Sequence, residues 1–366
     1  MVILVGISQA LLYVSFSILI GYMVLMLVPS KLRPAIRMPV NVLAMSTVFI
    51  PVMTFIPVLS ITLYIGRRLG FFEALKIVLM THTIGTAWCA TLLLSIVLFG
   101  LIIMAARTNS IGKVPFALVG VLVTIGLVFT VAWSSHAGAV NPALGILSDF
   151  IHLLAVSVWV GVILVVGWFS RNTENWSQFL GWFTFVALSC LGATAISGFL
   201  LLDVLVDGYS DAWMVSYGQG LLMKHLMLIP LIFYALVNGL FVKYKVANDS
   251  TFNPLPGVRV EGFILLTIFM LTAFFSQQSP PHGYFLTSDA VSPLFKMFHS
   301  DVIDASSTIG FVGNGMGIAL FFGSIILYGL QVLAFFKKAP ILISFLISCL
   351  FVGSVYVTIM LSITVQ

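Results

Sequence analysis

The chain has 366 residues, of which 61% are hydrophobic and 7% are charged, with a formal net charge of +5 at pH 7. Its mean hydropathy of +1.18 excludes an ordinary soluble globular domain. The apolar runs are continuous and longer than twenty residues, which predicts membrane-spanning helices rather than the short alternating strands of a barrel. We therefore expect an all-α polytopic integral membrane protein, a helical bundle of about ten transmembrane helices.

Ten apolar segments separated by short polar breaks are the predicted spans. They cover residues 2–29, 40–65, 77–105, 114–136, 143–170, 178–206, 217–242, 259–276, 306–335 and 340–364. The first segment lacks a basic stretch before it and a cleavage pattern of small residues, so we expect a retained span rather than a signal peptide. The polar stretch 277–305 is the one large loop, and we expect a single membrane domain over residues 1–366.

The orientation follows from the lysines and arginines, because loops rich in them stay in the cytoplasm. With the N-terminus outside, eleven of the sixteen basic residues fall in loops on the cytoplasmic face: Lys31, Arg33, Arg37, Arg107, Lys113, Arg171, Lys243, Lys245, Arg259, Lys337 and Lys338. We therefore expect both termini to be extracytoplasmic. This loop asymmetry accounts for the net charge, so we do not expect binding to nucleic acid.

No motif of soluble enzymes is present in the sequence. It has no P-loop, no GxGxxG that opens a helix after a strand, no HExxH and no GxSxG. Cys89, Cys190 and Cys349 lie inside predicted spans and form no CxxC pair, so neither a disulfide framework nor a zinc site is indicated. We expect that the protein is not an enzyme.

All six histidines fall on one side of this topology, either outside the membrane or in its outer half. They are His82, His136, His152, His225, His282 and His299. Histidine is the commonest metal ligand, and polar residues inside spans mark functional sites because lipid makes them costly. The pattern indicates a place where a metal ion arrives from outside. We interpret His282 and His299, in the long loop, as solvated residues.

The segment 147–161 carries the most polar chemistry of any predicted span. Asp149, His152 and Trp159 share a helix face at spacings of three and seven residues. An aspartate one turn from a histidine can orient its ring or bind the same ion. The same pair can equally be a hydrogen bond that fixes helix packing, and Trp159 is better explained as a core residue.

A second polar group lies at 217–227. Met223 and Met227 share a face, whereas His225 is rotated about 200° from Met223, so the three cannot bind one ion on an ideal helix. Thioethers favour Cu(I), and Met80 lies two residues before His82. Methionines at such spacings are nevertheless more often core residues than ligands.

Lys224 is the residue of this group that opposes a nearby cation. An ammonium at this depth is expensive unless it reaches outward or is paired with an acid. The sequence offers Asp203 and Asp149 as partners.

These residues resemble the copper resistance protein D (CopD) family, which includes the YcnJ-type copper proteins. The matching elements are Asp149-x-x-His152 with Trp159-Val-Gly161, Ser197-Gly198, Tyr217-Gly218, Leu221-Leu222-x-Lys224, Arg259-x-Glu261 and Pro280-Pro281. They place a CopD-like core at about 140–285, with additional spans in 1–136 and 306–364. The CopC-like soluble domain of many relatives has no counterpart here. The resemblance implies a bacterial inner-membrane protein that handles copper, usually by uptake.

We therefore expect a copper-binding membrane protein that imports copper ions, Cu(I) or Cu(II), from the extracytoplasmic side. The candidate ligands are His82, His136, His152, His225, Asp149, Met80, Met223 and Met227. The most specific prediction is one copper site that contains His152 and His225 and is completed by His82 or His136. Expected partners are the lipid bilayer and a separate extracytoplasmic copper-binding protein. Two alternatives remain: a haem-binding electron-transfer protein, and a copper-handling assembly factor for a respiratory oxidase.

Overall fold

The structure is a computed structural model that describes residues 2–249, 252–281, 290–300, 303–304 and 306–366. Ten helices in this described part are long and apolar enough to cross a membrane. The expected all-α polytopic fold is thereby confirmed. The chain divides into two compact units, unit 1 (Met1–Val204 with Val242–Asn253) and unit 2 (Leu205–Phe241 with Pro254–Gln366). The predicted single membrane domain stays a prediction.

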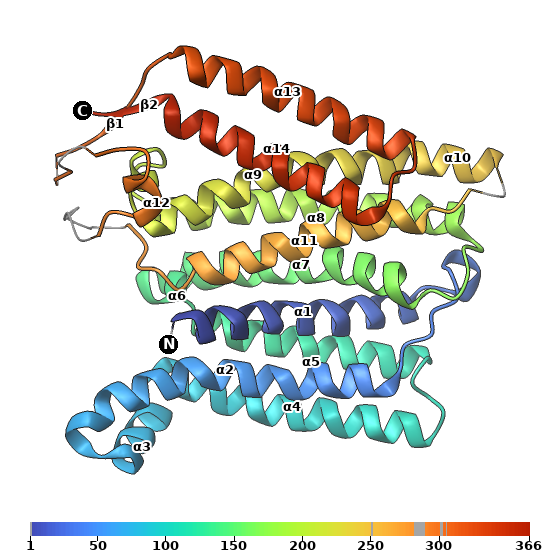
Figure 1. The fold of residues 1–366 in the computed structure, drawn as a ribbon. Coiled ribbons are helices and arrows are strands. Elements are labelled where there is room, and N and C mark those ends of the chain that lie inside the picture. Colours follow the sequence, from blue (N-terminus) through green and yellow to red (C-terminus); the bar gives the residue numbers. More distant parts are fainter. Residues whose placement is uncertain (1, 250–251, 282–289, 301–302, 305) are drawn as a thin grey trace. The chain divides into compact units, whose positions relative to one another are not determined.

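Unit 1 is built around α1. The helices of this unit are α1 (Val2–Leu27), α2 (Val40–Leu69), α3 (Phe71–Thr81), α4 (Thr83–Arg107), α5 (Val114–Trp133), α6 (His136–Val140), α7 (Pro142–Phe169), α8 (Trp176–Leu205, in unit 1 to Val204) and α10 (Val242–Asn248). Helix α1 packs against α7, α2 and α5 (Figure 1). A Cβ on Gly21 of α1 would lie 2.1 Å from the backbone carbon of Gly161 on α7, so only glycines permit this approach.

The basic loops of unit 1 meet at one end of its helices. The segment after α1 pairs with the segment after α7, because Arg37 N–H donates to Phe169 O (2.8 Å) and Arg171 N–H donates to Ala35 O (2.8 Å). The indole of Trp182 also donates to Leu32 O at 2.9 Å. Loops that the charge pattern assigns to one face therefore lie together within unit 1.

The predicted span 77–105 is wrong at its start, because the chain breaks at His82. Helix α3 ends at Thr81 and α4 begins at Thr83, with His82 in an extended conformation between them. A Cβ on Gly85 would lie 2.0 Å from Val78 O, so this glycine lets α4 turn tightly away from α3. The break is marked only by the short polar run Thr81-His82-Thr83 between apolar segments. The sequence pattern therefore predicted one helix where there are two.

Unit 2 contains four long helices and a small sheet. Its helices are α9 (Ser216–Leu236), which continues as a π-helical turn (Val237–Phe241), α11 (Leu255–Phe275), α12 (Pro293–Lys296), α13 (Gly315–Phe336) and α14 (Ile341–Leu361). A 3₁₀ turn (Asp211–Met214) precedes α9. Helix α11 packs against α9 and α14, and α13 packs against α14 (Figure 1). The antiparallel strands β1 (Ile309–Phe311) and β2 (Ile363–Val365) close the unit.

The predicted span 306–335 also begins too early. Residues 309–311 form β1, and the helix starts only at Gly315. Asn314 caps α13, because its Oδ1 accepts from the N–H of Gly317 at 2.6 Å. The other predicted spans agree with the observed helices to within a few residues, except that the seventh continues to Val246.

Candidate functional site

The candidate ligands are distributed over both units. Met80, His82, His136, Asp149 and His152 lie in unit 1, and Met223, His225 and Met227 lie in unit 2. In unit 1, His82 directly precedes α4, His136 begins α6 and His152 lies in the first half of α7, and in unit 2 His225 lies in the first half of α9. His282 falls outside the described residues. Within the part of the chain that the structure describes, no three His, Cys, Asp or Glu side chains are grouped as a metal ion requires.

His152 is held by a serine from the neighbouring helix. It lies ten residues after the start of α7, about 15 Å along the helix, and its side chain is half-buried. Its Nδ1 is 3.2 Å from Oγ of Ser197 on α8. A Cβ on Gly198 would be 3.5 Å from His152 Cε1, so the ring also lies against this glycine. The pair Ser197-Gly198 thus forms one wall of the His152 position.

The hydrogen bonds of Ser197 determine which ring nitrogen of His152 carries the proton. The Ser197 hydroxyl donates its one hydrogen to Ala193 O at 2.6 Å, the shorter of its contacts. Its oxygen can then only accept from His152, which places the proton on Nδ1. The lone pair of the neutral ring is then on Nε2. This is the arrangement of most metal-binding histidines, whose second nitrogen donates to a fixed oxygen.

Asp149 and Trp159 lie on α7 with His152. The burial of Trp159 agrees with its expected role, whereas the role expected of Asp149 is not tested. Trp159 is 4% exposed, which agrees with its interpretation as a core residue. Asp149 is half-buried one turn before His152. The hydrogen bond that fixes Nδ1 goes to Ser197, and the orienting role expected of Asp149 stays a prediction.

His225 is held by a tyrosine from the loop that precedes α9. The Tyr209 hydroxyl is 2.6 Å from His225 Nδ1, and the Tyr209 ring makes an edge contact with Trp213 at 5.6 Å between centroids. Burial raises the pKa of the Tyr209 phenol above its ordinary value, so the phenol is protonated at neutral pH. The phenol oxygen can also accept from Nδ1–H, and in that tautomer Nε2 of His225 carries the lone pair that a metal ion needs.

A glycine explains why the Tyr209 loop can reach His225. A Cβ on Gly218, in the first turn of α9, would lie 1.9 Å from Ala212 O. Only glycine therefore lets the 3₁₀ turn at 211–214 fold back on the helix. The sequence motif Tyr217-Gly218 carries this signal, but Tyr209 itself, sixteen residues before His225, was missed as a site residue.

The methionine and lysine candidates differ in their surroundings. Met227 is 2% exposed, as expected of a core residue, whereas Met80 in unit 1 is 70% exposed. The Lys224 ammonium lies over the Phe275 ring, 5.7 Å from its centroid, which is within the range of a cation–π contact. The pairing of Lys224 with Asp203 or Asp149 stays a prediction.

His82 and His136 are exposed residues at helix junctions of unit 1. His82 separates α3 from α4, and His136 opens α6 directly after Ser135, whose hydroxyl accepts from Gly138 N–H at 3.1 Å. Both are accessible at the end of unit 1 where α7 begins. Their expected role in completing a copper site stays a prediction.

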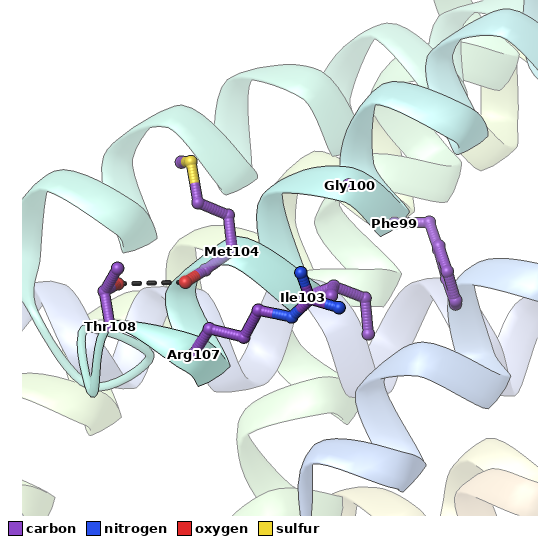
Figure 2. A pocket seen from close by; sticks show the side chains of 6 residues that line it. All are labelled: Phe99, Gly100, Ile103, Met104, Arg107 and Thr108. Atoms are coloured by element: carbon purple, nitrogen blue, oxygen red, sulfur yellow. Dashed lines mark hydrogen bonds between the residues drawn. The ribbon is translucent and has the colours of Figure 1, made fainter.

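A surface hollow of unit 1 lies far from these histidines. It has a volume of about 410 Å³ and is lined by Phe99, Gly100, Ile103, Met104, Arg107 and Thr108 (Figure 2). All six residues belong to the last turns of α4 or the residue after it, at the opposite end of the helix from His82. The hollow is therefore separate from the histidine site.

The polar elements that hold His225 fall inside a known family match. Residues 177–275 match the family model described as Copper resistance protein D. These residues form a CopD segment. The resemblance inferred from the motifs at 197–198 and 217–218 is confirmed. The CopD segment supplies Ser197, Tyr209 and His225, while His152 comes from the helix before it.

A curated relative extends this likeness. A stretch of 147 residues is 29% identical to the copper transport protein CutJ of Bacillus subtilis (strain 168), and the match covers 38% of this chain. It covers 27% of that protein, so the chain matches little more than a quarter of the relative's length. No solved structure matches the chain. With ten such apolar helices in its described part, the chain is a multi-pass membrane protein, and its CopD segment is similar to proteins named for copper resistance and copper transport.

Proposed function

We propose that the protein is a copper transporter that accepts the ion on the extracytoplasmic side and moves it toward the cytoplasm. The observation that carries the proposal is the His152–Ser197 hydrogen bond, which turns the lone pair of Nε2 away from Ser197. His152 is the first ligand that we assign to the ion. His225, whose Nδ1 is bonded to Tyr209, is the ligand assigned in unit 2.

The remaining ligands follow from accessibility. His82 and Met80 are exposed where α3 meets α4, and we assign them to the first contact with copper or with an extracytoplasmic protein that carries it. His136 and Asp149 lie at or near the start of α7, and buried Met227 and half-buried Met223 would assist if the ion is Cu(I). That His152 and His225 serve one ion remains a prediction, which the copper stoichiometry of single and double variants tests.

The proposed direction rests on charge. Eleven of the sixteen basic residues fall in the loops assigned to the cytoplasm, which supports an orientation with both termini outside and the histidines in the outer half. The sequence has no P-loop for ATP. An inside-negative membrane potential supplies about 2.3 kcal/mol per elementary charge per 100 mV, which favours inward movement of a cation. We place the protein in the bacterial plasma membrane.

Copper flux into proteoliposomes that contain this protein alone tests the proposal. An impermeant copper indicator inside reports the initial rate with an imposed inside-negative potential. We expect flux that rises with the potential and falls by more than about tenfold in His152→Ala, because a direct ligand is lost. His299→Ala is the matched control, since His299 bonds to Met360 O at 3.0 Å and stacks on Phe295.

Two results would contradict the proposal. Tight copper binding without flux would identify an assembly factor that holds the metal. A purified protein with a Soret absorption band and no copper would identify a haem protein.

A further inference from the structure

Unit 2 contains a buried acid that the copper chemistry above does not use. Glu261, in the second turn of α11, is 4% exposed. Its Oε2 accepts a hydrogen bond of 2.8 Å from Nδ2 of Asn238. Asn238 belongs to the π-helical turn that ends α9, and such turns are rare and frequently occur at functional sites.

The amide of Asn238 is only half satisfied. Its Oδ1 is buried and has no hydrogen-bond partner in the part of the chain that the structure describes. Buried acceptors normally have a donor. An ionised carboxylate beside this oxygen has no hydrogen to give, whereas a protonated carboxyl has one.

The packing of α9 on α11 holds these two groups together (Figure 1). A Cβ on Gly257, one turn before Glu261, would lie 2.6 Å from Asn238 Oδ1. The absence of a side chain at Gly257 therefore makes room for the amide. An ionised carboxylate whose partner is one neutral amide inside a membrane span would be costly, so this environment favours the protonated acid.

The other charged groups of these helices lie at a distance or on another face. The titratable side chains are Tyr217, Lys224, His225 and Tyr234 on α9, Cys349 and Tyr356 on α14, and Arg259 on α11 itself. Lys224 lies over Phe275, which is fourteen residues and about 21 Å along α11 from Glu261. Arg259 is rotated by about 200° from Glu261 on the same helix. Tyr234, one turn from Asn238, is neutral at pH 7.

We propose that Glu261 and Asn238 form a proton-binding site that is loaded and unloaded as copper moves. In the loaded state Asn238 Nδ2 donates to one carboxyl oxygen of Glu261, and the proton on the other oxygen is donated to Asn238 Oδ1. In the unloaded state the proton has passed to water. The proton site stands on geometry alone, and its link to copper rests on the proposed transport function.

Infrared spectroscopy of the full-length protein in liposomes without copper tests the proton site. We expect a carbonyl band of a protonated carboxylic acid at neutral pH that disappears in Glu261→Gln and remains in Glu174→Gln, whose acid is exposed. Glutamine can both accept from Nδ2 and donate to Oδ1, so this variant should fold. Asn238→Ala should shift the band to higher frequency, because the carbonyl loses its donor. Absence of a band assignable to Glu261 overturns the proposal.

Adding copper to the same samples tests the coupling. We expect the acid band of wild type to change on copper addition and no such change in Glu261→Gln, with copper binding by both proteins confirmed separately by metal analysis. A band that is present but indifferent to bound copper overturns the coupling. If the wild-type protein binds no copper, the proposed transport function is contradicted instead. The proton site is then still tested by the copper-free spectra.

Discussion

Replacing Ser197 by alanine removes the hydrogen bond that assigns the His152 proton to Nδ1 and preserves the α8 backbone. Ser197 Oγ bonds to His152 Nδ1 at 3.2 Å and to Ala193 O at 2.6 Å. Ala193 O keeps its bond within α8, so the substitution leaves no helix carbonyl unsatisfied. The loss therefore falls on His152, whose Nδ1 loses its hydrogen bond to Ser197.

The expected cost can be bounded from two directions. A neutral hydrogen bond contributes about 0.5–1.5 kcal/mol net, and the partner of a metal-binding histidine typically contributes about 10–100-fold in metal affinity. The His152–Ser197 distance of 3.2 Å is at the long end for a hydrogen bond, so we take the low end of the affinity range, which coincides with the upper end of the hydrogen-bond range. We expect Ser197→Ala to weaken copper binding by about tenfold, or about 1.4 kcal/mol.

Competition titration with a copper chelator measures this change. Ser189→Ala is the matched control, because Ser189 is an exposed serine two turns earlier on the same helix, and its affinity should equal wild type. His152→Ala should lose more than Ser197→Ala does. The reasoning is refuted if Ser197→Ala binds copper as tightly as wild type while His152→Ala does not, because the serine would then have no part in preparing the ligand.

Three further predictions use other contacts. Tyr209→Phe removes the 2.6 Å bond to the Nδ1 of the assigned ligand in α9 and should weaken copper binding by up to about tenfold; unchanged affinity in a titration would remove that residue from the site. Gly161→Leu should lower the melting temperature sharply, because the α1 backbone leaves no room for a Cβ. The control Gly192→Ala, with open space around the residue, should leave the melting temperature unchanged or raise it. Equal melting temperatures of the two variants would contradict the close packing. In a protein without native cysteines, Glu174→Cys should react only with a cytoplasmic thiol reagent and Ala139→Cys only with an external one, and the reverse pattern would invert the proposed direction.

Hydropathy predicts the spans well because lipid imposes one requirement along the whole length of each helix. It fails where a single residue decides the path. The break at His82 depends on Gly85, which lets two turns approach at 2.0 Å from a virtual Cβ to Val78 O, and β1 depends on pairing with residues 363–365 at the end of the chain. Neither the tight approach nor the distant pairing alters the local pattern of apolar residues.

The sequence predicted only those features of the candidate site that depend on spacing within a single helix. The spacing of Asp149 and His152 on α7 identified a polar face, and in the structure both side chains are half-buried. The partner of the His152 ring comes from Ser197, forty-five residues later on α8. The partner of His225 comes from a loop whose position depends on Gly218. Spacing within a helix carries no information on such contacts, although the family motifs included both Ser197 and Gly218.

Helix α9 joins the two proposed sites of unit 2 and is irregular between them. His225 lies near its start and Asn238 in its final π-helical turn, thirteen residues and about 20 Å apart. Pro230 lies inside the helix between them and has no N–H for the Leu226 carbonyl. Helices bend most easily at a proline and at a π turn. A displacement of the α9 backbone at His225 can therefore be absorbed by bending before it reaches Asn238. Coupling between copper and the proton at Glu261 would then require one of these two irregular turns to change, and both lie within the CopD segment.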